Sequence, residues 1–228
     1  MRISVVTFPG SNCDYDTYRV CKSRGNQTKL IWHKDSDLEK PDLVILPGGF
    51  SYGDYLRCGA LARFSPIVQE VIAFARKGGL LVGICNGFQI LTECGLLPGT
   101  LIMNENLHFI CQHQYIRVET EASPFTQGIG KGKVMDIPIA HKEGNYYIDP
   151  EGLKQLIAND QILFRYCDKQ GNINIESNPN GSLDNIAGIC NKQRNILGMM
   201  PHPERSATET VPTKDGRWIF AAIENALE

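Results

Sequence analysis

The sequence has no excess of charge of either sign. Its 228 residues include 23 Lys and Arg against 25 Asp and Glu, a formal net charge of -2. Proteins that bind nucleic acid usually display a basic surface, so this balance argues against that class. No apolar run reaches the roughly 18 residues that a membrane-spanning helix needs, and the 42% hydrophobic content argues against disorder. We therefore expect a globular protein that binds neither nucleic acid nor a membrane.

The cysteines lack the spacing of a zinc or dithiol redox site. There are eight of them, and no two are three positions apart, so the chain has no C-x-x-C motif. Their even number allows disulfides, but a chain of this length buries enough surface to fold without such cross-links. The cysteines are also scattered through apolar segments. We therefore expect reduced thiols, a cytoplasmic location and no metal.

Cofactor motifs and domain boundaries are missing as well. No G-x-G-x-x-G follows the first apolar segment, and the glycine-rich stretch at 128–133 lacks the spacing and the Ser or Thr of a phosphate loop. We therefore expect no dinucleotide cofactor. No repeat, low-complexity tract or linker divides the chain, and this absence predicts one domain over residues 1–228.

What the sequence does contain is an alternation of short apolar strands with helices, followed by a run of strands. The first part predicts strands at 3–8, 28–32, 43–46 and 80–84 and helices at 14–24, 66–77 and 88–94. The second part predicts strands at 109–120, 134–140, 162–167, 186–190 and 196–200 and helices at 152–158 and 218–227. This order predicts an α/β protein with an open, mostly parallel sheet, helices on both faces and an antiparallel extension.

The strongest local signal is the segment Gly83-Ile-Cys-Asn-Gly87 between a predicted buried strand and a predicted helix. Small residues on both sides allow the tight turn that exposes a nucleophile at the carboxyl end of a strand. The helix N-terminus favours the reactive thiolate of Cys85, and the Asn86 amide lies where an oxyanion would form. The alternative is a buried, inert cysteine, which we prefer for the other seven.

A thiol nucleophile needs a base, and His202 in Pro201-His-Pro-Glu204 follows another predicted strand. In an extended segment, His202 and Glu204 project to the same side, and Glu204 then orients the imidazole. On the tetrapeptide alone, a proline-rich surface turn is the better interpretation. The Cys-His-Glu interpretation prevails only if both motifs lie at the same edge of the sheet.

Two glycines at 48 and 49 end the predicted strand 43–46. They allow an unusual backbone conformation in which a peptide N–H faces a ligand, which would supply a second oxyanion donor. A simple tight turn explains the same residues about as well.

Together these segments resemble the class I (triad) glutamine amidotransferases, and more closely the glutaminase subunits of bacterial phosphoribosylformylglycinamidine synthases. The G-x-C-x-G-x-Q element at 83–89 marks the class. The resemblance extends over nearly the whole chain and includes the stretches Phe8-Pro-Gly-Ser-Asn-Cys-Asp14, Gly53-Asp-Tyr-Leu-Arg-Cys-Gly59 and Gly198-Met-Met-Pro-His-Pro-Glu-Arg205. The fold that it implies is flavodoxin-like.

The resemblance implies a role for each matched position. Cys85 would attack the glutamine carboxamide to form a glutamyl thioester, His202 would transfer protons, and Glu204 would orient His202. Further implied roles are an oxyanion hole from the amides of Gly49 and Asn86 and substrate binding by Gln89.

The resemblance also implies partners. Ammonia would pass to the large synthetase subunit PurL, which uses ATP and magnesium, and a small subunit, PurS, would bridge the two. This chain would itself carry no cofactor. The family commonly has His-Gly-Glu-Gly where this chain has Lys142 in second position, a departure in the loop and not in the triad.

Two alternatives remain at this point. The first is a cysteine peptidase or another hydrolase with a similar nucleophile turn, against which Gln89 and Glu204 both argue. The second is a non-catalytic regulatory subunit, which would have no reason to keep Cys85, His202 and Glu204 together.

Overall fold

A nine-stranded mixed sheet organises the chain, and the computed structural model describes all of residues 1–228. In their order across the sheet, the strands are β2 (Gln27–Trp32), β1 (Arg2–Thr7), β3 (Leu43–Leu46), β4 (Leu80–Ile84), β11 (Ile196–Met199), β10 (Ile186–Cys190), β9 (Ile162–Tyr166), β6 (Ile110–Val118) and β7 (Val134–His141). A separate antiparallel pair consists of β5 (Thr100–Ile102) and β8 (Asn145–Tyr147).

The sheet has a parallel half and an antiparallel half. Strands β2, β1, β3, β4 and β11 run parallel, and β10, β9, β6 and β7 continue the sheet with antiparallel pairings. The parallel strands have the order of a flavodoxin-like sheet, with β11 in fifth place although it comes from the far end of the chain. The predicted fold class, including the antiparallel extension, is confirmed.

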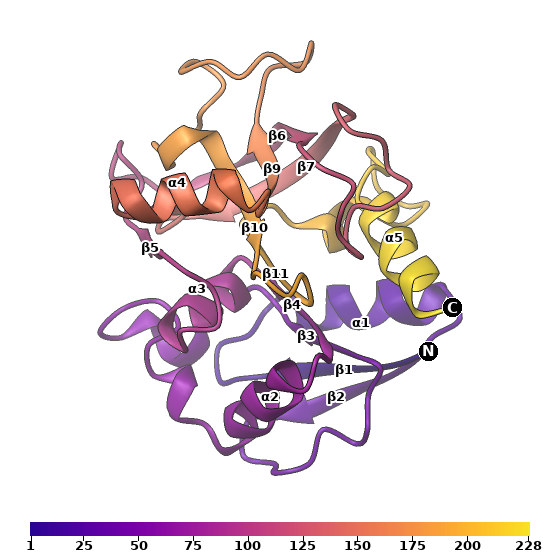
Figure 1. The fold of residues 1–228 in the computed structure, drawn as a ribbon. Coiled ribbons are helices and arrows are strands. Elements are labelled where there is room, and N and C mark those ends of the chain that lie inside the picture. The colour runs from indigo at the N-terminus through magenta and orange to yellow at the C-terminus, as the bar shows by residue number, and fades with distance from the viewer.

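Five helices complete the main architecture: α1 (Asp14–Ser23), α2 (Pro66–Arg76), α3 (Asn86–Glu93), α4 (Pro150–Ala158) and α5 (Arg217–Leu227). Helices α2 and α3 cover one face of the parallel strands, α1 and α5 cover the other, and α4 lies beside the antiparallel part (Figure 1). Strand β3 is buried along its whole length for this reason, which explains its uninterrupted apolar sequence. None of the helices combines the length and the apolar character that crossing a membrane requires.

The topology fixes where chemistry can occur. In open α/β sheets, ligands bind beyond the carboxyl ends of the parallel strands. Strands β3, β4 and β11 are direct neighbours, with Gly83 of β4 paired to Leu46 on one side and to Gly198 on the other. The segments that follow these three strands therefore emerge side by side at one edge, and they contain Gly49, Cys85 and His202.

Short elements account for most of the differences from the predicted secondary structure. The sequence analysis missed the three-residue strands β5 and β8 because they are too short to show a period. Helix α3 begins at Asn86, two residues before the predicted start, because the chain turns into the helix directly after Cys85.

Candidate active site

Cys85 occupies a strained turn between β4 and α3. Its backbone has φ 51° and ψ −105°, a combination that residues with a side chain rarely adopt. Such a conformation costs on the order of 1–3 kcal/mol and persists only where the surrounding structure imposes it. Here the Cys85 amide donates a 2.8 Å hydrogen bond to the Met199 carbonyl oxygen of β11, and the Cys85 carbonyl accepts one from Gln89 in α3. The predicted strand–turn–helix geometry around the thiol is therefore present.

The two glycines that flank Cys85 are needed because α3 crosses the sheet at very short range. A Cβ atom on Gly87 would lie 2.0 Å from the Leu46 carbonyl oxygen, and one on Gly83 would lie 2.7 Å from the Gly87 carbonyl group. Both obstacles are backbone atoms, which cannot rotate away.

We expect Gly87→Ala to displace α3 and with it the Cys85 turn. Overpacking of this kind typically costs about 1–3 kcal/mol, and an error of about 1 Å in a reacting group can cost roughly 10²-fold in rate. Thermal unfolding and steady-state glutaminase assays would measure both effects. The matched control is Gly152→Ala in α4, whose new Cβ would have side-chain atoms of Ile148 and Asp149, and no carbonyl group, as its nearest neighbours. Equal behaviour of the two variants would contradict this account of the turn.

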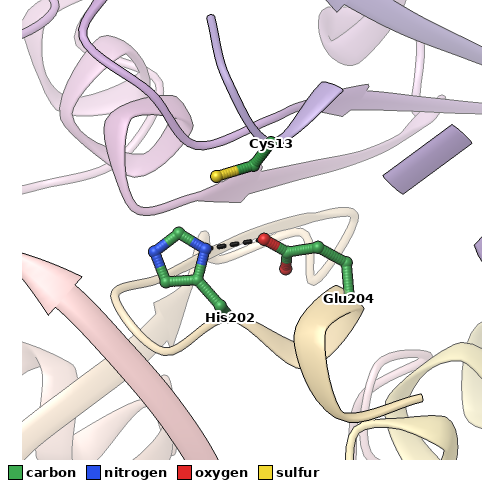
Figure 2. Close-up of side chains that lie close together, drawn as sticks. All are labelled: Cys13, His202 and Glu204. Atoms are coloured by element: carbon green, nitrogen blue, oxygen red, sulfur yellow. Dashed lines mark hydrogen bonds and ion pairs between the residues drawn. The ribbon is translucent and has the colours of Figure 1, made fainter. Parts of the chain in front are cut away.

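His202 and Glu204 are in contact, although not for the predicted reason. His202 Nδ1 donates a 2.6 Å hydrogen bond to Glu204 Oε1, and the two side chains are 1% and 0% exposed (Figure 2). The prediction that an extended segment carries them is wrong, because Pro203 begins a 3-10 helix over Pro203–Ser206. Proline fits a first helical position, since its φ is already suitable and its missing N–H would have no partner there.

The charge state of His202 is set by its buried neighbours. Burial opposes the charged imidazolium, but the negative charges of Glu204 and of a Cys85 thiolate outweigh this effect and raise the pKa of His202 well above its ordinary value. The structure shows no hydrogen bond between Cys85 and His202. The Cys85 Sγ atom lies 3.6 Å from the Ala140 carbonyl oxygen, and His202 Nε2 is buried without a partner. Catalytic hydrogen bonds are often loose in the absence of substrate.

The peptide between Gly48 and Gly49 is held in one orientation. Its carbonyl oxygen accepts hydrogen bonds from the amides of Cys13, at 3.2 Å, and Asn12, at 3.5 Å. Because a trans peptide directs its C=O and N–H to opposite sides, the Gly49 N–H points away from these two residues. It donates no hydrogen bond within the chain, and Gly49 lines a cleft of about 150 Å³ together with His202.

Asn86 and Gln89 connect the Cys85 turn to its surroundings. Asn86 accepts a hydrogen bond from the Ser51 amide at 3.1 Å and donates one to Gln89 Oε1 at 2.9 Å. Gln89 Nε2 then donates to the Glu143 carbonyl oxygen at 2.7 Å. As the first residue of α3, Asn86 has a backbone amide without a partner in the preceding turn of helix. A side-chain amide keeps one donor and one acceptor position after two bonds, so Gln89 retains capacity for a ligand.

The structure adds two residues to which the sequence analysis gave no role, Cys13 and Arg205. The Cys13 sulfur lies within 4.8 Å of ligand atoms of His202 and Glu204, and Figure 2 shows it beside the imidazole. The Arg205 guanidinium donates a 3.0 Å hydrogen bond to the same sulfur. The position of Cys13 just after β1, a parallel neighbour of β3, was the signal that placed it at this edge.

Three side chains, Cys13, His202 and Glu204, form the only group of potential metal ligands in the chain. His202 Nδ1 and Glu204 Oε1 are already engaged in their mutual hydrogen bond, and the Arg205 cation on the Cys13 sulfur opposes a metal ion there. The donor set therefore fits a hydrogen-bonded His202–Glu204 pair beside a thiol better than a metal centre.

Comparison with known proteins identifies the family. A CobB/CobQ-like glutamine amidotransferase domain matches residues 1–219. The chain belongs to this glutamine amidotransferase family. Its Cys85 turn, buried His202–Glu204 pair and free Gly49 amide are thus features of a glutamine amidotransferase.

Similar proteins cover this glutamine amidotransferase from end to end. It is 55% identical to the phosphoribosylformylglycinamidine synthase subunit PurQ of Acaryochloris marina over 228 residues, which are 100% of this chain and 97% of the relative. It is 54% identical to PurQ of Koribacter versatilis, over 100% of this chain and 99% of the relative. A chain in the solved structure of PurLQS from Thermotoga maritima is 41% identical, with a TM-score of 0.88. The match covers 100% of this chain and 99% of that one. The fold is shared by a solved glutamine amidotransferase from Thermotoga maritima with a TM-score of 0.58. Its sequence is 16% identical, and the match covers 99% of this chain and 83% of that one.

Proposed function

We propose that this chain is the glutaminase subunit of phosphoribosylformylglycinamidine synthase. It hydrolyses glutamine to glutamate and ammonia, which the synthetase subunit uses in de novo purine biosynthesis. The observation that carries the proposal is Cys85 at positive φ in the turn after β4, beside a buried His202–Glu204 pair, in a chain 55% identical to a PurQ. A peptidase would have no use for an ammonia-accepting partner, and a non-catalytic subunit would have no need of the strained Cys85 turn.

The reaction begins at the sulfur. The Cys85 thiolate attacks the carboxamide carbon of glutamine, and the resulting oxyanion accepts hydrogen bonds from the amides of Gly49 and Asn86. Preorganised donors of this kind stabilise the charge that develops in the transition state. The His202 imidazolium gives its proton to the departing nitrogen, so ammonia and a glutamyl thioester form.

Hydrolysis of the thioester then regenerates the site. His202 takes a proton from water, the hydroxide attacks the thioester carbonyl, and glutamate leaves as the Cys85 thiolate returns. Glu204 holds His202 Nδ1 throughout, which leaves Nε2 for both proton transfers. Gln89 uses its remaining donor and acceptor positions to hold the substrate next to the Cys85 turn.

The proposal includes partners and a location. Residues 1–228 act as one glutamine amidotransferase domain, which passes ammonia to PurL and is bridged to it by PurS, in the cytoplasm. No cofactor belongs to this subunit, because ATP and magnesium serve the reaction of the synthetase. The names PurQ and PurLQS of the similar proteins support this assignment.

We expect the isolated subunit to be a poor glutaminase. In the subunit alone, the Cys85 sulfur lies 3.6 Å from the Ala140 carbonyl oxygen and His202 Nε2 has no hydrogen-bond partner, so the Cys85–His202 hydrogen bond is not formed. Partner binding would favour the conformation that forms it, a shift set by the difference in affinity for the two states. A rate increase of roughly 10²-fold or more is expected, since small misplacements of reacting groups have effects of this size.

The test compares steady-state ammonia release by the purified subunit with release by the subunit plus PurL, PurS, magnesium and nucleotide. Equal rates in the two samples would contradict the coupling and identify an independent glutaminase. No glutamine hydrolysis in the complete mixture would contradict the proposed function itself.

A further inference from the structure

The imidazole of His202 is enclosed by residues other than Glu204. On one side, Gly48 approaches so closely that a Cβ atom there would lie 2.6 Å from His202 Cε1. The same Cβ would lie 3.1 Å from the Cys13 sulfur, so Cys13 packs at the same place. The His202 backbone is fixed separately, because its amide donates a 2.8 Å hydrogen bond to the Pro138 carbonyl of β7. Glu204 holds the ring at Nδ1, and Cys13 is the side chain placed beside the ring to limit its remaining tilt.

Cys13 is itself held rigidly. It is 1% exposed, its thiol donates a 3.0 Å hydrogen bond to Asn12 Oδ1, and its sulfur accepts the 3.0 Å hydrogen bond from Arg205. Arg205 in turn approaches Asp16 of α1 at 3.5 Å, and the Arg205 amide donates to the His202 carbonyl. The thiol is thus connected to α1 on one side and to the 3-10 helix after His202 on the other.

The chemistry of Cys13 does not fit a second nucleophile. Burial raises the pKa of the Cys13 thiol above its ordinary value, so the group stays neutral at physiological pH. The thiolate is the reactive form of cysteine. A neutral thiol with its hydrogen bonds already made serves as a packing and hydrogen-bonding group.

We propose that Cys13, held in place by Arg205, is a positioning residue that keeps the His202 imidazole aligned between Glu204 and Cys85. The proposal rests on the proposed glutamine hydrolysis and assigns it a further residue. Without the sulfur, the ring gains room to tilt, and Nε2 loses its alignment with the Cys85 sulfur and the leaving nitrogen. Cys13 lines the cleft beside Gly49, but the hydrogen bonds of its sulfur are made to Asn12 and Arg205, so we expect KM for glutamine to change little.

The test uses the complete complex with PurL and PurS and measures kcat and KM for glutamine in Cys13→Ala, Cys13→Ser and the control Cys190→Ala. Cys190 is equally buried but lies on β10. Cys13→Ala is expected to lower kcat about 10- to 100-fold with KM within about twofold, the effect of a misplaced reacting group. The kcat of Cys13→Ser should lie within about fivefold of the wild-type value, because a hydroxyl also donates and accepts a hydrogen bond. Cys190→Ala should keep the wild-type kcat.

A second variant tests the link to Arg205. Arg205→Leu removes the donor to the sulfur and should lower kcat with little change in KM. The kcat of the double variant Cys13→Ala/Arg205→Leu should be no lower than that of Cys13→Ala alone, because both changes disrupt the same contact. If the Cys13→Ala variant does not assemble into the complex, the kcat of Arg205→Leu decides whether the proposal holds.

The proposal is wrong if Cys13→Ala matches Cys190→Ala in kcat, if KM alone rises, or if Arg205→Leu keeps the wild-type kcat. It is also wrong if the two losses multiply in the double variant. A wild-type complex that hydrolyses no glutamine would overturn the proposed function instead, so the two failures are distinguishable.

Discussion

Replacing Cys85 by alanine should remove glutaminase activity almost completely. The nucleophile of a triad acts as a unit with its base, and loss of a triad nucleophile has cost about 10⁶-fold in kcat in a well-studied hydrolase. The side chain is nearly buried, and alanine fits the space, so we expect the fold to persist. The measurements are ammonia release in the complete complex and thermal unfolding of the variant.

A glutamine-analogue affinity label provides the control for this substitution. It should modify Cys85 in the wild-type protein, and glutamine should protect against the modification. Cys111 is the one exposed thiol but lines the cleft of Gly49 and His202, so only labelling of Cys111 that glutamine does not block reports on reaction without recognition. Labelling of Cys58 or Cys94 by the analogue, with Cys85 untouched, would contradict the assignment.

The second large effect concerns the base. His202→Ala should lower kcat by roughly 10³- to 10⁴-fold, the upper part of the range for general acid–base catalysis. Glu204→Gln should cost less, because glutamine keeps the shape and an acceptor oxygen for His202 Nδ1. It removes only the charge that helps to raise the pKa of His202. Steady-state kinetics of both variants in the complete complex would establish the order.

His141 is the nearest alternative base, and its environment argues against that role. Burial and the neighbouring His202 lower the pKa of His141 to about 3, and its Nδ1 lies 3.2 Å from Asn104 Oδ1. A histidine held neutral in this way cannot act as the imidazolium that protonates the leaving nitrogen. Near-wild-type turnover in His202→Ala would nevertheless reverse the assignment and require His141→Ala as the next variant.

The sequence predicted the central part of the fold because that part obeys local rules. An uninterrupted apolar strand such as β4, followed by Gly-x-Cys-x-Gly, fixes a strand, a turn and a helix in order. The placement of Cys85, His202 and Gly49 at one edge followed from strand direction once their strands were taken to be neighbours. What it required was that β11 join the sheet next to β4, which the structure confirms.

The remaining features depend on tertiary contacts that have no local signal. The 3-10 helix at Pro203–Ser206 replaces a predicted extended segment, and Pro203 did not decide between them because the φ of proline suits both a first helical position and an extended segment. The partnership of Cys13 with Arg205 joins residues that are 192 positions apart. Gln89 likewise reaches the Glu143 carbonyl across 54 positions. The residue types were visible in the sequence, but their partners could be named only from the structure.

The most direct test of the account is a comparison of nitrogen donors in the complex that contains Cys85→Ala. Amidine formation from formylglycinamide ribonucleotide and ATP would be measured once with glutamine and once with an ammonium salt. The account predicts that glutamine-dependent synthesis falls by at least about 10⁴-fold, as expected for loss of the nucleophile, while ammonia-dependent synthesis stays at the wild-type rate. Glutamine-dependent synthesis that survives in this variant would contradict the claim that this chain supplies the ammonia from Cys85.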